Sequence, residues 1–488
     1  MGARRAGILC LALIVLIAGA GAAAAAGPDL RLIDAGKRDD QAAVKALVAA
    51  GVNVNARAGD GSTALHWAAQ NDDMVLADLL IRKGAKINAA TDLGITPLWI
   101  AATNSSTAMI NRLLQARADP NIAPPTDGSP LMLVAQQGNV EAVKTLLAHG
   151  ANPEAREAAR GQTALMWAVS ARRPDVVRAL LEAHADVKAR STSWTQRMVL
   201  CCQLYEGDDA GVAMVAVGGY TPLLFAAQDG DVESTRLLLA AGADPNDAAP
   251  DGSSAVVIAA HAGQDDVAKL LLNAGANPNA AGSGYTALHV AAMRGDLALM
   301  EALIDHGADL NARQQKGSPT QRVASGHALD IRLNGATPYM LAVHLSQLKA
   351  MQLLVYRGAD PSIPLYDGRT PLMVLAGPGT REGFNASDAL LTETVKLAAH
   401  LGTPVNQADP NGDTALHVAA TRRRDAVVQA LVDSGAVINV RNNKGETPLT
   451  AALTPPGPPK GTLLAEEYNF LVFHKQTAEL IRKLGGTT

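Results

Sequence analysis

Apolar and polar positions follow one order along this chain, and that order repeats many times. A Thr or Ser is followed by Pro or Ala, then by an apolar residue, and seventeen residues after the Thr or Ser a Leu precedes another aliphatic residue. This grouping predicts two short amphipathic helices in each unit. The Thr or Ser anchors are Thr63, Thr96, Ser129, Thr163, Thr221, Ser254, Thr286, Thr337, Thr370, Thr414 and Thr447, of which Ser254 begins a weaker copy.

The residues near each anchor suit the ends and contacts of short helices. A Thr hydroxyl before a helix can accept a hydrogen bond from an exposed backbone N–H. Pro97 and Pro222 fit the first helical position, where the missing N–H loses no bond. A Gly four residues after the Leu predicts a left-handed helix end. Because Arg117 and His184 replace this Gly in two units, we expect those two helix ends to be capped differently.

The spacing of the anchors gives the architecture. Thr63 to Thr96 and Thr96 to Ser129 are each 33 residues apart. A period of 33 residues with the phrase Thr63-Ala64-Leu65-His66 resembles the ankyrin repeat, over most of the chain. The resemblance implies an all-α ankyrin-repeat solenoid of about twelve helix-turn-helix repeats with projecting β-turn fingers, in which each helix pair buries its apolar face only against its neighbours.

Departures from the period divide the chain into segments. Longer intervals after Thr163, Thr286 and Thr370 indicate three insertions, and no helix can pass the prolines that begin at Pro455. An apolar helix after these prolines closes the stack or forms a partner-binding tail. The predicted segments are 1–26, a signal peptide; 27–56, a degenerate capping repeat; 57–189, repeats; 190–217, a finger insertion; 218–312, repeats; 313–332, a loop insertion; 333–454, repeats with an inter-helix insertion near 377–387; and 455–488, a Pro-rich break and a capping helix.

The N-terminal residues differ in composition from the rest. Arg4 and Arg5 precede an apolar run at 8–18 and an alanine tract that ends at Ala26, which is the pattern of a secretory signal peptide cleaved after Ala26. An exported protein, periplasmic or extracellular, follows from cleavage. Because residues 6–26 carry no charge, a retained membrane anchor is the alternative.

Composition and motifs argue against several other functions. A formal net charge of −4 does not favour nucleic-acid binding. The chain has no CxxC, HExxH or EF-hand motif, so we expect neither a metal nor another cofactor. His66, His289 and His417 share one position of the unit but lie several units apart, so they cannot meet at one ion. The resemblance implies a structural hydrogen-bonding role for them instead.

The same resemblance implies that the finger turns and inner helices form a concave face that binds proteins. Aromatic side chains are effective anchors there, because they bury a large area with few torsions to freeze. The aromatic residues that follow the His position could equally serve packing between stacked helices. The candidate partner-binding residues are Trp67, Trp167, Tyr220, Phe225, Tyr285, and, in the long finger, Trp194 and Tyr205.

The leading hypothesis is an exported, non-catalytic scaffold that binds another protein. The insertions are too short to form a separate catalytic domain. Two alternatives stay open, a membrane-tethered scaffold and an enzyme or enzyme inhibitor that acts through residues 190–217, where Cys201 and Cys202 accompany Trp194. The partner is left unspecified, because repeats define a surface shape and not a ligand.

Overall fold

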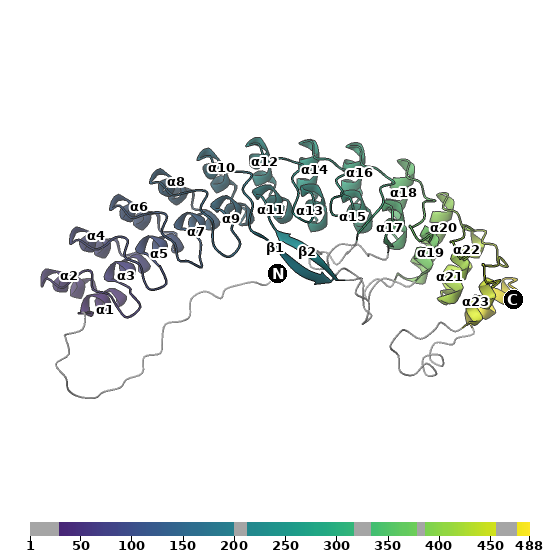
Figure 1. Ribbon diagram of the computed structural model, residues 1–488, viewed down its shortest axis with the longest axis horizontal. Coiled ribbons are helices and arrows are strands. Elements are labelled where there is room, and N and C mark those ends of the chain that lie inside the picture. Colours follow the sequence, from purple (N-terminus) through teal and green to yellow (C-terminus); the bar gives the residue numbers. More distant parts are fainter. Residues whose placement is uncertain (1–28, 200–211, 317–332, 378–385, 455–475) are drawn as a thin grey trace, which may run out of the picture.

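The protein is a curved stack of helix pairs (Figure 1). The computed structural model describes residues 29–199, 212–316, 333–377, 386–454 and 476–488. The 24 helices within these residues form pairs, from α1 with α2 to α23 with α25, and each pair packs against the next. The predicted all-α solenoid of about twelve repeats is therefore confirmed.

The two helices of each pair lie in two rows, an inner row on the concave side of the arc and an outer row on the convex side (Figure 1). The inner helices are α1 (Arg31–Lys37), α3 (Ala64–Gln70), α5 (Pro97–Thr103), α7 (Pro130–Gln137), α9 (Ala164–Ser170), α11 (Pro222–Asp229), α13 (Ala255–Ala262), α15 (Ala287–Arg294), α17 (Pro338–His344), α19 (Pro371–Ala376), α21 (Ala415–Thr421) and α23 (Pro448–Leu453). The outer helices are α2 (Gln41–Ala49), α4 (Met74–Arg82), α6 (Thr107–Gln115), α8 (Val140–Ala148), α10 (Pro174–Glu182), α12 (Val232–Ala240), α14 (Asp265–Asn273), α16 (Leu297–Asp305), α18 (Leu348–Tyr356), α20 (Asp388–His400), α22 (Asp425–Asp433) and α25 (Gln476–Lys483).

The inner helices after α1 begin at the Thr or Ser anchors. The Thr96 hydroxyl accepts a hydrogen bond from the backbone N–H of Trp99 at 3.1 Å, and Pro97 is the first helical residue. The first helix is different, because its N-cap residue is Leu30, which forms no side-chain cap. Side-chain capping therefore fixes the start of the later inner helices and is absent from the N-terminal helix α1.

The core is a continuous apolar seam between the two rows. The Leu that follows each anchor by seventeen residues is buried in every unit where the sequence places one, and removing such a side chain costs about 2–5 kcal/mol. The small Ala pairs of the inner helices, such as Ala68 and Ala69, are also fully buried, which lets neighbouring helices approach closely. The buried anchor leucines are Leu80, Leu113, Leu146, Leu180, Leu238, Leu271, Leu303, Leu354 and Leu431.

The expectation of different caps at Arg117 and His184 is wrong. Both adopt the left-handed conformation, with φ of 67° and 62°, as Gly84 does in its repeat. The backbone bonds also match, since Arg117 N–H donates to Leu114 at 2.9 Å and Gly84 N–H donates to Ile81 at 3.0 Å. The helix-ending hydrogen bonds thus impose the conformation, at a cost of about 1–2 kcal/mol for a residue with a side chain.

The first insertion forms a β-hairpin. Strands β1 (Ser193–Val199) and β2 (Val212–Gly218) pair in antiparallel register, with Trp194 opposite Val217. The hairpin projects from the concave side, below α11 and α13 in Figure 1. In the part of the chain that the structure describes, it is the only sheet.

The remaining predicted segments fall partly outside the described residues. The signal peptide at 1–26, most of the loop at 313–332, most of the insertion near 377–387 and the Pro-rich stretch all lie there. Helix α25 is described, and it packs against α22 and α23, in the place of an outer helix of the last pair.

Replacing Arg117 with Gly should stabilise the chain. The side chain is exposed, so the substitution relieves the left-handed strain without loss of packing. We expect the free energy of unfolding to rise by about 1 kcal/mol, measured by urea denaturation of the full chain. Gly84→Ala is the matched control and should lower it, because a Cβ there meets no atom within 4 Å and adds only strain. A lower stability for Arg117→Gly would contradict this account.

Candidate protein-binding surface

The concave face is formed by the inner helices and by the fingers, the turns that precede each inner helix. In four repeats, the side chain at the fourth position of the anchor phrase ties the inner helix to the next finger. Nε2 of His66 lies 3.0 Å from the carbonyl oxygen of Ile95, and Nδ1 accepts from the N–H of Thr63 at 3.0 Å. His417 makes the same contacts with Thr414 and Glu446. The structural role expected of these histidines is confirmed.

Trp99 occupies the same position and also links its inner helix to the next finger. The sequence pattern did not indicate this role. Its indole N–H donates to the carbonyl oxygen of Gly128 at 3.0 Å, in the following finger. The signal was its place three residues after Thr96, where other repeats have His66 or His417. The described residues contain no group of three His, Cys, Asp or Glu side chains that could hold a metal ion.

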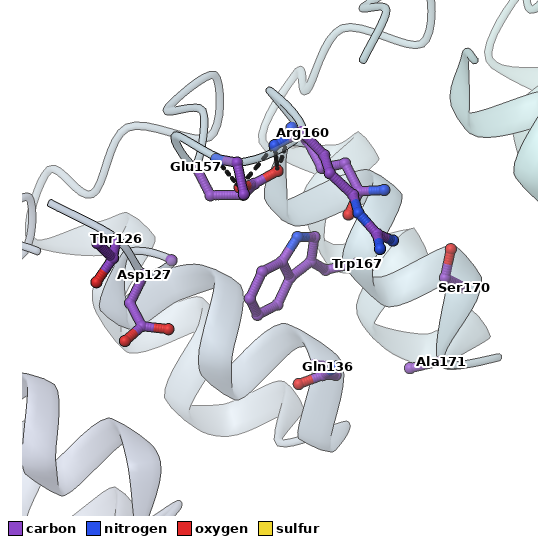
Figure 2. A pocket seen from close by; sticks show the side chains of 11 residues that line it. Thr126, Asp127, Gln136, Glu157, Arg160, Trp167, Ser170 and Ala171 are labelled. Atoms are coloured by element: carbon purple, nitrogen blue, oxygen red, sulfur yellow. Dashed lines mark hydrogen bonds between the residues drawn. The ribbon is translucent and has the colours of Figure 1, made fainter. Parts of the chain in front are cut away.

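A pocket of about 370 Å³ lies between two fingers and the inner helices α7 and α9 (Figure 2). The indole of Trp167, one of the candidate residues, lies at its centre, between Asp127 and the turn that carries Glu157 and Arg160 (Figure 2). We call it the Trp167 pocket. Its lining residues are Thr126, Asp127, Gly128, Gln136, Glu157, Ala159, Arg160, Gln162, Trp167, Ser170 and Ala171.

Glu157 shapes the upper wall of this pocket. Its carboxylate is buried and accepts backbone N–H bonds from Ala159 at 2.6 Å, Arg160 at 2.8 Å and Gln162 at 3.1 Å. These bonds satisfy the charge and hold the turn in place. Glu157 thus has a structural role in the finger, because its carboxylate oxygens are occupied by backbone N–H groups.

The floor and rim of the pocket differ in character. The six-membered ring of Trp167 packs against Gly128, where a Cβ would lie only 3.0 Å from the ring. Its indole N–H is enclosed by the protein and has no hydrogen-bond partner among the residues that the structure describes. Asp127 and Arg160 are exposed at the rim. The pocket therefore offers an aromatic surface and both signs of charge.

Tyr220 and Phe225 form a second aromatic group on the same face. Their rings meet edge to face, with centroids 5.5 Å apart, and both are half-buried against the core. The backbone carbonyl of Tyr220 accepts from Ser191 at 2.9 Å, which places the pair at the base of the β-hairpin. These two residues contribute to packing and to the surface.

Tyr285 is a correction to the predicted surface. It is only 1 % exposed, and its ring meets His261 of α13 edge to face at 5.2 Å. The ring turns from the finger into the core instead of projecting into the groove. The prediction that Tyr285 projects from the concave face is wrong.

The other candidates are placed separately. Trp67 is half-buried near the N-terminal end, with the ammonium of Lys37 5.3 Å from its ring centroid. Trp194 is on β1 and is 44 % exposed. Tyr205 lies outside the described residues. Among the described residues, no two of Trp67, Trp167 and Trp194 have their rings in contact.

Comparison with protein families decides what the stack is. The model described as ankyrin repeats (3 copies) matches residues 32–124, 122–191, 198–282, 223–314, 280–365 and 384–457, which together make up more than half of the chain. The chain belongs to the ankyrin-repeat family. Ankyrin repeats are scaffolds for protein–protein interaction, and they suggest protein partners for this chain.

Similar ankyrin-repeat proteins are much longer or match over a part only. Neurogenic locus notch homolog protein 1 of Xenopus tropicalis is 38 % identical over 94 residues, 18 % of this chain and 4 % of its own length. Ankyrin repeat and KH domain-containing protein mask-1 of Caenorhabditis elegans is 31 % identical over 234 residues, 42 % of this chain and 9 % of its own. NF-kappa-B inhibitor alpha of Mus musculus is 34 % identical over 105 residues, 22 % of this chain and 32 % of its own. The chain thus spans under a third of each relative's length.

Within the described ranges, no helix combines the length and the apolar composition that crossing a bilayer requires.

The stability of this ankyrin-repeat chain should fall in mild acid because of His289. The ring is fully buried, and burial lowers its pKa from 6.5 to about 4. Because Nε2 lies 3.1 Å from the carbonyl oxygen of Ala336, which can only accept, the neutral ring carries its proton there and Nδ1 accepts from Thr286. With a pKa below that of the unfolded chain, the stabilisation is full above about pH 6.5 and is lost towards pH 4.

The measurement is the free energy of unfolding of the wild type and of His289→Leu from pH 7 to pH 4. The difference between them should shrink by about 2–3 kcal/mol over this range, since only the wild type takes up a proton at this ring on unfolding. His149→Gln changes an exposed histidine and should keep the full pH dependence. A constant difference between wild type and His289→Leu would contradict the assignment.

Proposed function

We propose that the chain is an exported ankyrin-repeat scaffold that binds another protein through its concave face and fingers and catalyses no reaction. The Trp167 pocket is the observation that carries the proposal. It combines a large aromatic ring with charged rim residues on the face that consecutive repeats build together. A partner side chain that fills it would gain the area burial that makes interface hot spots.

Export is supported by the N-terminal sequence. The pattern of Arg4, Arg5, an apolar run and an alanine tract ending at Ala26 is typical of a cleaved signal and supports a mature chain in the periplasm or outside the cell. The alternative is a scaffold tethered by the same segment. The third hypothesis, an enzyme or enzyme inhibitor that acts through residues 190–217, has the exposed Trp194 in its favour.

Mass spectrometry of the protein purified from its host tests export and cleavage together. We expect a mature chain that begins at Gly27, recovered from the periplasm or the medium. A full-length chain in the membrane fraction would support the tethered alternative instead. This result would not bear on the binding surface, which the next experiment tests.

Affinity capture from the envelope and secreted fractions tests the binding face. Trp167→Ala removes the pocket's ring, and Arg160→Glu reverses an exposed rim charge with little effect on packing. We expect the affinity for the captured protein to fall at least tenfold with Trp167→Ala, because centrally placed Trp residues carry much of the binding energy of interfaces.

Tyr356→Ala is the matched control, because this tyrosine is 87 % exposed on the outer helix α18. It should leave the affinity unchanged. If the partner is held equally by the wild type and by both pocket variants, the Trp167 pocket is not the binding site.

A further inference from the structure

One contact between neighbouring outer helices differs in chemistry from its counterparts in other repeats. In the first two helix pairs, the side-chain amide of Gln41, the first residue of α2, donates to the carboxylate of Asp73, the N-cap of α4, at 3.1 Å. The side chains of Thr107, the first residue of α6, and Asn139, the N-cap of α8, form the same link at 3.0 Å. Both links contain a side-chain donor that needs no additional proton.

Two carboxyl groups occupy the same place between α14 and α16, which are neighbours in the outer row (Figure 1). Asp265 is the first residue of α14, and Asp296 is the N-cap of α16. A hydrogen bond joins the two side chains. Because an ionised carboxylate can only accept, this bond requires a proton on one of the two groups.

A single guanidinium lies beside both carboxyl groups. Nitrogens of Arg294, the last residue of α15, lie 3.5 Å from an oxygen of Asp265 and 3.6 Å from an oxygen of Asp296. The guanidinium also donates to the carbonyl oxygen of Ala260 at 2.7 Å, which holds it in place. The other cation that acts on Asp265 is Lys269, one turn further along α14. The Asp265 and Asp296 side chains are only 31 % and 13 % exposed, so water screens little of the repulsion when both are ionised.

The shared proton belongs to Asp265. Asp296 already accepts from the backbone N–H of Leu299 at 3.1 Å, and this capping bond favours its ionised form. Burial, the hydrogen bond with Asp296 and the charge of Asp296 raise the pKa of Asp265 from 3.8 to about 6, against the opposite effects of Arg294 and Lys269. A proton thus supplies the donor that a neutral side chain supplies in the other links.

We propose that Asp265 and Asp296 form a proton-binding pair that ties two neighbouring repeats together in mild acid and loosens their junction at neutral pH. The inference does not depend on the proposed function. Because the pKa of Asp265 lies above its unfolded value, the stabilisation is full below about pH 3.8 and is lost as the pH rises through about 6. The sign is opposite to that of His289 in α15, whose contribution is lost towards acid.

Hydrogen exchange of the full chain, measured by mass spectrometry, tests the pair. The backbone amides of α14 and α16 report the opening of this junction. The ratio of their protection factors in the wild type and in Asp265→Asn cancels, at each pH, the effects of His289 and of intrinsic exchange. We expect this ratio to fall about tenfold from pH 5 to pH 7.5, because Asn donates to Asp296 without titrating and only the wild type loses a proton.

Two further variants separate the pair from a simple loss of charge. Asp266→Asn removes the same formal charge from an exposed neighbour in the first turn of α14, and the ratio of wild type to this variant should change less than twofold over the same pH range. Asp296→Asn keeps a cap acceptor for Leu299 but removes the second carboxyl group. It should therefore give the same tenfold change as Asp265→Asn.

A ratio of wild type to Asp265→Asn that stays constant with pH would overturn the inference. An equally large change with Asp266→Asn, or no change with Asp296→Asn, would overturn it as well, since the effect would then not come from the pair. These measurements involve no partner protein, so their outcome leaves the proposed function as it stands.

Discussion

Each helix pair in this chain has an apolar face that only the neighbouring pairs can cover. The seam of fully buried residues, from Leu80 to Leu431, belongs to no single repeat, because these leucines are all part of one apolar cluster that runs through the stack. Stability is therefore a property of the contacts between pairs. The same constraint explains the ends of the stack, where α1 lacks a side-chain cap and α25 covers α22 and α23.

This constraint also makes the concave surface. Because stacking fixes the position of each inner helix, it fixes the finger that precedes it, and a pocket can form from fingers that are about 30 residues apart in sequence. The wall at Glu157 and the floor at Gly128 come from different repeats, yet both contact the space around Trp167. A ligand in this pocket would contact two repeats at once.

The sequence predicts the fold well because its signals are local and repeated. A Thr followed by a Pro, as at Thr96 and Pro97, starts an inner helix in each repeat that has this pair. The regular period then predicts that the next helix pair stacks on it. The prediction was wrong where a local preference competed with backbone bonding. At Arg117 the helix-ending bonds impose a left-handed residue although no Gly is present.

The surface was less predictable, because the direction of a side chain depends on its neighbours. Tyr285 and Tyr220 occupy equivalent positions, yet Tyr285 turns inward beside His261 and Tyr220 stays half-buried beside Phe225. Trp167 was a candidate from its position alone, but the bonds of Glu157 that shape its pocket leave no pattern in the sequence. The hairpin lies in an insertion that interrupts the period, so the repeat pattern could not predict its strands.

The link from His289 to the following finger shows how the solenoid deals with interruption. His66 and His417 each reach a carbonyl 29 residues ahead, whereas His289 reaches Ala336 across 47. The same bond closes in all three cases, and α15 packs against α17 as neighbouring inner helices do elsewhere. The number of residues between two repeats therefore does not decide how those repeats contact each other at this junction.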